Sequence, residues 1–444
     1  MSDPRSGTPT TSLERDARRI NESDTADVVR PGDIAIGVII GRTSEFFDFF
    51  VYAIASVVVF PQRVFPFVDE LTGTLYSFAV FAVAFLARPF GTVIFTAIDR
   101  TFGRGMKLLV ALFLLGTSTV ALAFLPGYDQ IGVWSVWILI LMRCGQGLAM
   151  GGSWDGLPTL LALYAPQNRR GYYAMIPQLG ALIGLAIASA LFAFIISELS
   201  GADFLDWGWR FPFFVAFAIN VVALFARLRI VVTPEYAKAF ESRELQPSTI
   251  GETIRHGGRI IVIGAFTPLA SFALFHMVTV FPLSWVFLYT QDNPARFLSM
   301  QAIGAALGVA SIYASGFLAD RVGRRTLLGG TAAAIAAFSG FAPQLLGGGE
   351  VGEAVFMASG YVLLGLAFGQ ASGAVAANFP IHYRYTGSAM TSDLAWLFGA
   401  GFAPWVALAF SSRFGLAFAG VYLLSGALAT LIALYVSRKT MQDR

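Results

Sequence analysis

The chain has 444 residues, of which 56% are hydrophobic and only 13% are charged, and its formal net charge is +3. Soluble domains carry nearer to ~25% charged residues, so this composition excludes an ordinary soluble protein. So small a net charge argues against a nucleic-acid partner. The single cysteine, Cys144, excludes an intrachain disulfide.

Apolar segments recur along the chain at lengths that suit a membrane. A helix needs about 20 residues to cross the ~30 Å hydrocarbon core. In chain order, the twelve predicted spans are 34–60, 74–98, 107–125, 132–163, 171–197, 209–230, 258–289, 296–319, 326–346, 351–380, 386–410 and 415–437. The sequence therefore predicts an all-α integral membrane protein with twelve transmembrane helices.

A polar interval near the middle divides these spans into six and six. The motif DRTFGR at 99–104 in the first set recurs as DRVGRR at 320–325 in the second, which indicates duplication of a six-helix unit. The predicted organisation is a tail at 1–33, a first half at 34–230, a linker at 231–257, a second half at 258–437 and a tail at 438–444.

The positive charges predict which side faces the cytoplasm. Nearly all Lys and Arg residues outside the spans fall in the tails, the linker and the loops on one side, whereas the opposite side holds Arg63, Arg296 and Arg413. By the positive-inside rule both termini are cytoplasmic. The N-terminal tail has no short apolar stretch followed by a cleavage site, so we expect no secretory signal.

The repeated loop motif resembles the signature of the major facilitator superfamily, G-x-x-x-D-R-x-G-R-R/K. The second copy matches from Gly316 through Arg325, whereas the first inserts one residue before Gly103 and has Gly105 where a second base is usual. An acid followed by bases on a short turn can form ion pairs and helix-end contacts in one conformation and lose them in another. The resemblance implies gating roles for Asp99, Arg100, Arg104, Asp320, Arg321, Arg324 and Arg325. The alternative is lipid-facing charge that only sets topology.

Longer stretches look like the metabolite:proton symporter family, which includes porters for proline and betaine, α-ketoglutarate, citrate and shikimate. The stretches are SEFFDFFVY at 44–52, ARPFG at 87–91, RCGQGLAMGGSWDG at 143–156, YAPQNRRGYYAMIPQLGALIG at 164–184, DWGWRFPFF at 206–214 and RYTGSAMTSDLAWLFGAGFAP at 384–404. The pattern departs where Arg42 and Asp393 replace a usual Asn, and where Ser153 replaces a usual Glu with an acid at Asp155. The resemblance implies a major facilitator fold, while the departures leave the substrate open.

Charged residues inside the predicted spans mark the candidate chemistry. A charge at the bilayer centre costs at least ~2.5 to 3.5 kcal/mol, so such residues are predicted to face partners or a polar path. Arg42, Glu45 and Asp48 follow one another at intervals of three, which predicts a shared helical face. Glu45 or Asp48 is the first choice of proton carrier, because two such close acids are hard to keep ionised away from water, and Asp155 and Asp393 are further candidates. The alternative is a permanent structural ion pair.

Intramembrane arginines favour an anionic substrate, because a guanidinium stays protonated and can grip a carboxylate with two hydrogen bonds. Each arginine could instead balance a buried acid. The predicted substrate-binding residues are Arg88, Arg143, Arg42, Gln178, Tyr52, Trp154 and Trp396. The alternative for the glutamine and the aromatic residues is helix packing. His276 is either a proton relay or, more commonly for its type, a hydrogen-bonded core histidine.

The predicted function is secondary active transport, by proton symport, of a small organic anion such as a carboxylate. The setting is a bacterial cytoplasmic membrane and the transporter is expected to act as a monomer. The alternatives are symport of a zwitterionic osmolyte and proton antiport that exports a metabolite or drug. The sequence has no phosphate-binding loop, no Cys and His cluster with metal spacing and no evident catalytic set, so we expect no cofactor, no metal and no enzyme activity.

Overall fold

The computed structural model describes residues 31–153, 161, 165–231, 246–290, 293–372 and 379–442. Before the predicted linker its helices are α2 (Pro31–Val58), α3 (Phe60–Arg63), α4 (Glu70–Phe102), α5 (Arg104–Ala123), α6 (Tyr128–Ile131), α7 (Trp134–Gly152), η1 (Gln167–Arg169), α9 (Arg170–Glu198), α10 (Gly201–Asp206), η2 (Gly208–Arg210) and α11 (Phe211–Val231). After it they are α13 (Ile250–Phe266), α14 (Leu269–Thr279), α15 (Phe281–Tyr289), α16 (Pro294–Val322), α17 (Arg324–Leu346), α18 (Gly349–Phe368), α20 (Ile381–Trp396), η3 (Leu397–Gly401), α21 (Ala403–Phe414) and α22 (Ala417–Gln442).

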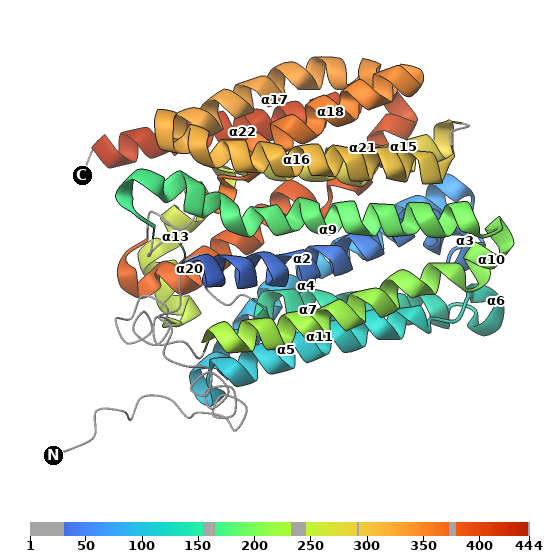
Figure 1. The fold of residues 1–444 in the computed structure, drawn as a ribbon, viewed down its shortest axis with the longest axis horizontal. Helices are drawn as coiled ribbons and strands as arrows, with labels where there is room; N and C mark the ends of the chain where they lie inside the picture. Colours follow the sequence, from blue (N-terminus) through green and yellow to red (C-terminus); the bar gives the residue numbers. More distant parts are fainter. Residues whose placement is uncertain are drawn as a thin grey trace.

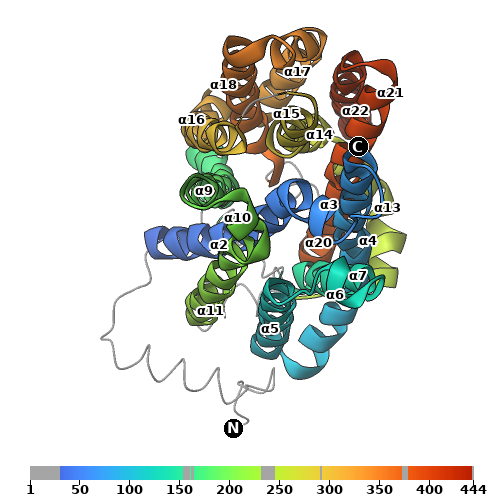
Figure 2. The same ribbon diagram turned by 90° about the vertical axis from the view of Figure 1, so that its right-hand side faces the viewer.

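The two sets of helices lie side by side with their long axes roughly parallel (Figures 1 and 2). Helices α16, α17, α18, α21 and α22 form one side of the molecule, and α2, α5, α7 and α11 form the other. Close packing of α9 on α16 and of α4 on α20 joins the two sides. Much of the predicted linker lies outside the described residues, and α13 begins inside its predicted range, so the division into halves stays a prediction.

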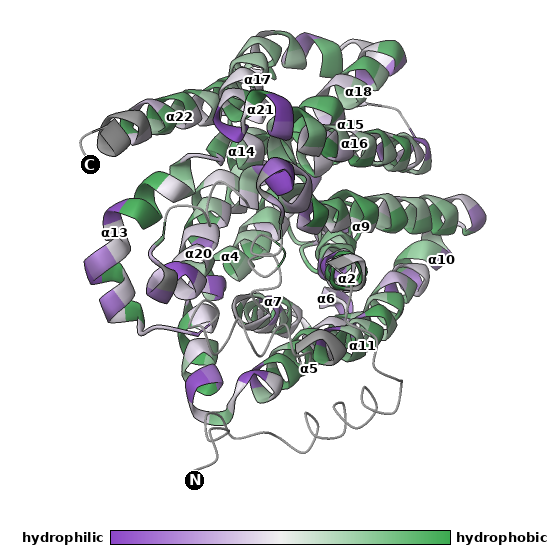
Figure 3. Ribbon diagram, turned by 60° about the vertical axis from the view of Figure 1, so that its left-hand side comes forward, coloured by the Kyte–Doolittle hydropathy of each residue, from purple (hydrophilic) through white to green (hydrophobic). Residues whose placement is uncertain are grey.

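Apolar residues cover most of the helices, and hydrophilic residues gather at helix ends and on α13 (Figure 3). Within the described residues, ten helical segments are long and apolar enough to cross a membrane. Helices α2 and α7 are not among these ten; α2 carries Arg42, Glu45 and Asp48, and α7 carries Arg143 and Gln146. Both pack lengthwise against the others, α2 on α9 and α11 and α7 on α4 and α5. The total of twelve therefore remains a prediction.

Local sequence explains several helix ends. Asp69 begins α4, where its carboxylate accepts hydrogen bonds from the Thr72 hydroxyl and backbone N–H, and these bonds hold the pKa of Asp69 below its usual value. Gly103 and Gly323 end α4 and α16 at φ values of 84° and 85°. Because residues with a Cβ rarely adopt that conformation, these glycines permit the same sharp turn in both copies of the repeated motif.

Several predicted spans are interrupted, contrary to the expectation of continuous helices, and two of them are 258–289 and 386–410. The 258–289 segment belongs to α13, α14 and α15, with breaks at Thr267–Pro268 and at Val280 before Pro282, because proline lacks the N–H that a continuous helix needs. The 386–410 segment contains the π-helix η3. Such bulges often occur at functional sites, and this one directly follows Trp396.

Candidate functional site

A pocket lies between α2, α4, α7 and α20. Its lining residues are Arg42, Glu45, Phe46, Phe49, Phe85, Arg88, Met150, Ser153 and Trp396. Arg88 precedes the end of α4 at Phe102 by 14 residues, or about 21 Å of helix, and the whole of α4 spans about 50 Å. The cavity therefore lies near the middle of the long helices, where both sets of helices meet.

Glu45 is held between two arginines at this cavity. Its Oε2 lies 2.9 Å from Nη1 of Arg42, and its Oε1 lies 2.7 Å from Nη1 of Arg227. Arg227 also donates to the backbone oxygen of Ser153, and its side chain is only 2% exposed. A Cβ on Gly41 would lie 2.5 Å from Nε of Arg227, so the glycine makes room for the guanidinium. The sequence analysis did not single out Arg227, although it lies within the predicted 209–230 span.

Arg88 and Asp393 form an ion pair that joins the two sets of helices. The Nε of Arg88 on α4 lies 2.7 Å from Oδ1 of Asp393 on α20, and the Thr92 hydroxyl donates to Oδ2. The side chains of Arg88 and Asp393 are 12% and 5% exposed. A predicted substrate residue and a predicted proton residue thus bind each other, which was the alternative left open for the arginine.

Asp48 points away from the cavity, so the predicted shared face is wrong for this residue. Six residues separate it from Arg42, which corresponds to a rotation of about 240° around the helix. The Thr119 hydroxyl lies 2.8 and 2.7 Å from the two carboxylate oxygens, and the amides of Asn220 and Gln146 donate to them at 3.1 and 3.3 Å. All three partners are neutral, and they come from α5, α11 and α7.

Arg143 also lies outside the cavity lining, although it was predicted to bind substrate. It donates to Gln146 and to the backbone oxygen of Phe81, and its guanidinium lies over the ring of Tyr52, 4.0 Å from the centroid. Phe49 lines the cavity and packs against Phe81, with centroids 5.3 Å apart. These rings lie between Arg143 and the cavity.

Several buried polar atoms have no hydrogen-bond partner among the described residues. They include the Tyr52 hydroxyl, both ring nitrogens of His276 and Oε1 of Gln178. The expected hydrogen bond of His276 is therefore missing from the described part of the chain, and its ring packs 5.5 Å from Phe49 and 5.4 Å from Phe81. Neither Tyr52 nor Gln178 lines the cavity.

Of the predicted aromatic contacts, Trp396 does line the cavity. It stacks on Phe85 with centroids 6.1 Å apart and meets Phe272 edge to face at 4.7 Å. Trp154 and Asp155 lie outside the described residues, so their predicted roles stay predictions.

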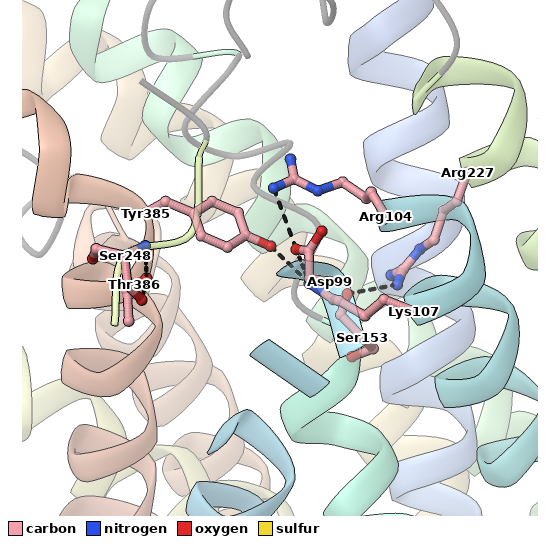
Figure 4. A network of polar contacts seen from close by, with 8 residues as sticks. All are labelled: Asp99, Arg104, Lys107, Ser153, Arg227, Ser248, Tyr385 and Thr386. Atoms are coloured by element: carbon pink, nitrogen blue, oxygen red, sulfur yellow. Dashed lines mark hydrogen bonds and ion pairs between the residues drawn. The ribbon is translucent and has the colours of Figure 1, made fainter. Parts of the chain in front are cut away.

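The first copy of the repeated motif makes an internal charge cluster. Asp99 lies 3.4 Å from both Arg104 and Lys107, and the Lys107 ammonium donates to the Tyr385 hydroxyl of α20 at 2.7 Å (Figure 4). The guanidinium of Arg104 lies over the Tyr385 ring, 4.6 Å from the centroid. Arg100 is exposed. This cluster therefore connects α4 and α5 with α20.

The second copy makes a different contact. Asp320 accepts hydrogen bonds from the backbone N–H groups of Gly171 and Tyr172, at 2.6 and 3.1 Å, where α9 begins. Arg324 donates to Gln370 and to the backbone of Arg170, both at 3.4 Å. Two further basic residues of this copy lie at the surface: Arg321 is exposed, and Arg325 donates to the backbone of Leu434.

One inserted residue explains why the two copies differ. Asp99 lies four residues before Gly103, whereas Asp320 lies three residues before Gly323. One residue rotates a side chain by about 100° around an α-helix. The two carboxylates therefore point in different directions from otherwise similar helix ends.

Polar residues in apolar helices were the signal that sequence reasoning did not use. Asn220 and Thr119 hold Asp48, Thr92 holds Asp393, and Lys107 contacts Tyr385. Asn220 in particular follows a run of apolar residues in α11. A buried amide at such a position needs a partner, and the charged residues nearby in the fold supply it.

Comparisons with known proteins agree with this architecture. Residues 38–392 match the family model described as Major Facilitator Superfamily. The inner membrane metabolite transport protein YhjE of Escherichia coli (strain K12) is 34% identical over 95% of this chain and 97% of that protein. The shikimate transporter of the same strain is 29% identical, over 92% of this chain and 94% of that protein.

A more distant relative and a solved structure extend the likeness. The proline/betaine transporter of Escherichia coli (strain K12) is 27% identical over 83% of this chain and 75% of that protein. The crystal structure of a D-xylose-proton symporter has a TM-score of 0.68 at 18% identity, over 91% of this chain and 96% of that one, which shows a shared fold. The chain is therefore a membrane transporter, not an enzyme, and it belongs to the Major Facilitator Superfamily.

Proposed function

We propose that this transporter takes up a small organic anion together with protons, by alternating access across the bacterial inner membrane. The observation that carries the proposal is the cavity near mid-membrane where Arg42 and Arg88 line the space between the two sets of helices. Substrate sites in transporters built from repeated units typically lie at such a position. The proposed topology keeps both termini in the cytoplasm, and the proposed working unit is a monomer of twelve spans.

The arginines and Trp396 are the proposed substrate contacts. Arg88 and Arg42 each approach the cavity with a guanidinium, which binds carboxylates through directional, charge-assisted hydrogen bonds. Trp396 offers an apolar face from the opposite set of helices. A compact carboxylate with a small carbon frame fits this combination of charge and aromatic surface.

Asp48 is the proposed proton carrier, ahead of Glu45. Glu45 lies between two guanidinium groups, and such neighbours favour the ionised carboxylate. Asp48 is 1% exposed and its hydrogen-bond partners are neutral, so burial works against its charge without a directly paired cation. Arg143 makes no direct ion pair with it: its guanidinium donates to Gln146, which donates to Asp48, and its charge acts on Asp48 from a longer distance. A proton on Asp48 would therefore alter the packing of α2 against α5, α7 and α11.

The two motif contacts are the proposed gate at the cytoplasmic end. The pair of Lys107 and Tyr385 and the pair of Asp320 and Gly171 each connect the two sets of helices. Both contacts must break if that end opens by rocking of one half against the other. They are the proposed determinants of the closed state.

Uptake by proteoliposomes tests the proposal. A panel of mono-, di- and tricarboxylates is offered with an inward proton gradient, with no gradient, and with an uncoupler. We expect at least one carboxylate to accumulate only when the gradient is present. Uptake that ignores the gradient for every transported carboxylate would contradict symport.

A zwitterionic substrate is the second candidate, favoured by the aromatic lining. Phe46, Phe49, Phe85 and Trp396 line the cavity beside Arg88. Aromatic rings bind quaternary ammonium groups, and the arginine would take the carboxylate of the same molecule. Glycine betaine and proline belong in the panel, and their selective accumulation would favour this candidate over an anion.

A further inference from the structure

A carboxylate already occupies a binding cradle at the edge of the cavity. The cradle consists of Nε of Arg88 and the hydroxyl of Thr92, which bind the two oxygens of Asp393 separately. Arg88 and Thr92 are four residues apart, so both donors lie on one face of α4. The carboxylate comes from α20, across the junction between the two sets of helices.

The cradle is continuous with the transport cavity. Arg88 lines the cavity directly, and so does Trp396, which follows Asp393 by three residues on α20. The cradle is nearly closed to solvent, since Asp393 is 5% exposed. A solute that enters the cavity would reach the guanidinium by displacing a single side chain.

We propose that Asp393 occupies the binding site of the substrate carboxylate when no substrate is bound. The two carboxylates then exchange on Arg88 and Thr92 during transport. This inference rests on the proposed function and narrows its substrate class to molecules with a carboxylate group. The donors that hold Asp393 are the ones that the substrate carboxylate uses. Asp393 and the substrate therefore compete for one site.

The exchange also accounts for protons. A displaced Asp393 stays buried without its cation, and a buried, unpaired carboxylate is strongly disfavoured. It therefore takes up one proton when the substrate carboxylate binds Arg88. The ion pair of Arg88 and Asp393 becomes an ion pair of Arg88 and substrate plus a neutral Asp393, so each bound carboxylate brings one proton to Asp393, in addition to the proton proposed for Asp48.

The charged and titratable neighbours of Asp393 are few in the described elements that pack on α20. Arg88 of α4 pairs with it directly. His276 of α14 packs on Trp396, with centroids 6.3 Å apart, and His256 of α13 stacks on Tyr383 at 5.3 Å. The η3 segment, LFGAG, has no titratable side chain. Arg88 is thus the group that sets the charge state of Asp393.

Formate tests the cradle without knowledge of the natural substrate, because it is the smallest carboxylate. The full-length protein is purified in detergent and its thermal unfolding is compared in equal concentrations of sodium formate and sodium chloride. Asp393→Ala leaves the cradle open, so we expect formate to raise its Tm by several degrees more than chloride does. The double variant Asp393→Ala/Arg88→Gln should lose that difference.

Asp48→Ala is the matched control, since it also removes a buried carboxylate but one held by neutral donors. It keeps the Arg88–Asp393 pair, so its formate-dependent rise in Tm should equal that of the wild-type protein and stay well below that of Asp393→Ala. If Asp393→Ala does not fold, Asp393→Ser takes its place in the same comparison. A folded Asp393 variant that ignores formate, or an equal formate effect in Asp48→Ala, overturns the inference.

The pH dependence of formate binding tests the proton. In the wild-type protein the apparent Kd for formate should fall by about tenfold for each unit by which the pH is lowered, because binding takes up one proton. This holds over the pH range in which formate binding protonates Asp393. In Asp393→Ala the Kd should change less than about twofold. Equal pH dependence in the two proteins would refute the exchange. If formate binding shows the expected pH dependence but proton-driven uptake fails, the result counts against the proposed symport and not against the exchange.

Discussion

Asp48 and Glu45 lie three residues apart on α2, yet only Glu45 is paired with cations. This difference leads to a prediction for Asp48→Asn, which keeps the size of the side chain and removes the carboxylate. We expect proton-driven accumulation of substrate to fall by at least about tenfold, while counterflow exchange of the same substrate persists. The measurement is accumulation and exchange in the same proteoliposomes, with the carboxylate identified in the uptake panel as substrate.

Thr119→Val serves as the control for this experiment, because it removes one of the neutral partners of Asp48 and leaves the carboxylate in place. It should lower the stability of the protein and retain coupling. Full accumulation by Asp48→Asn would show that the proton is carried elsewhere, with Glu45, Asp155 or Asp393 as the remaining candidates.

Arg227 is predicted to be a structural partner of Glu45. Breaking a buried ion pair typically costs 3–5 kcal/mol, and Glu45 keeps Arg42 when Arg227 is lost. We therefore expect Arg227→Met to reduce the free energy of unfolding by about 3 kcal/mol, measured by chemical denaturation in detergent. In a double-mutant cycle with Glu45→Gln, the double variant should lose less free energy of unfolding than the sum of the two single variants. Independent, additive effects of the two substitutions would argue against their coupling.

The sequence was sufficient to predict pairs that lie close along one helix, and it was insufficient for pairs between helices. Arg42 and Glu45 were recognisable because three residues place them on adjacent positions of α2. The partner of Arg88 could not be chosen among the buried acids, because the contact with Asp393 depends on how α4 meets α20. Thr119 and Asn220 were missed for the same reason.

At the level of helices, glycines on α7 and α4 control how closely these elements approach. A Cβ on Gly151 would lie 2.3 Å from the backbone oxygen of Arg88 and 2.4 Å from the backbone nitrogen of Thr92. Since both neighbours are backbone atoms, they cannot yield by rotating a side chain. We therefore expect Gly151→Ala to push α7 away from the cradle, lowering Tm by several degrees and abolishing uptake.

Gly330→Ala is the matched control for this prediction. Gly330 lies in α17, where a Cβ would meet nothing within 4 Å. The variant should keep wild-type Tm and uptake. A Gly151→Ala protein with unchanged Tm and unchanged uptake would show that the crossing of α4 and α7 is more adaptable than the close backbone contact indicates.

Helix positions were predictable from apolar length, and helix continuity was not. The predicted 171–197 and 326–346 spans lie within α9 and α17, which extend them by a few residues at most. Hydropathy gives no sign of the breaks between α13, α14 and α15, and the sequence marks them only by Pro268 and Pro282. The π-helix before α21 likewise depends on packing, because a Cβ on Gly399 would lie 2.6 Å from Phe272.

For the whole molecule, the duplicated motif predicted two equivalent halves, whereas the two copies make unlike contacts. Asp99 binds two bases of the following helix α5, and Asp320 binds the first backbone N–H groups of α9. The inserted residue was visible in the sequence, but its effect depends on the direction of a side chain at the end of a helix. The second copy is therefore the better place to test how the closed end is held.

Asp320→Ala should shift the protein toward opening at the end where α9 begins. The substitution removes two hydrogen bonds to a carboxylate, each worth about 1.5–3 kcal/mol, and the loss of even one corresponds to about tenfold in a conformational equilibrium.

A Ser153→Cys reporter in a Cys144→Ser background reports access to the cavity, since Ser153 lines it. We expect a maleimide that cannot cross the membrane to label this cysteine about tenfold faster in Asp320→Ala when applied from that side. Arg413→Ala, an exposed substitution in the last turn of α21, should leave the rate unchanged, and equal labelling in all three proteins would mean that Asp320 does not hold the gate.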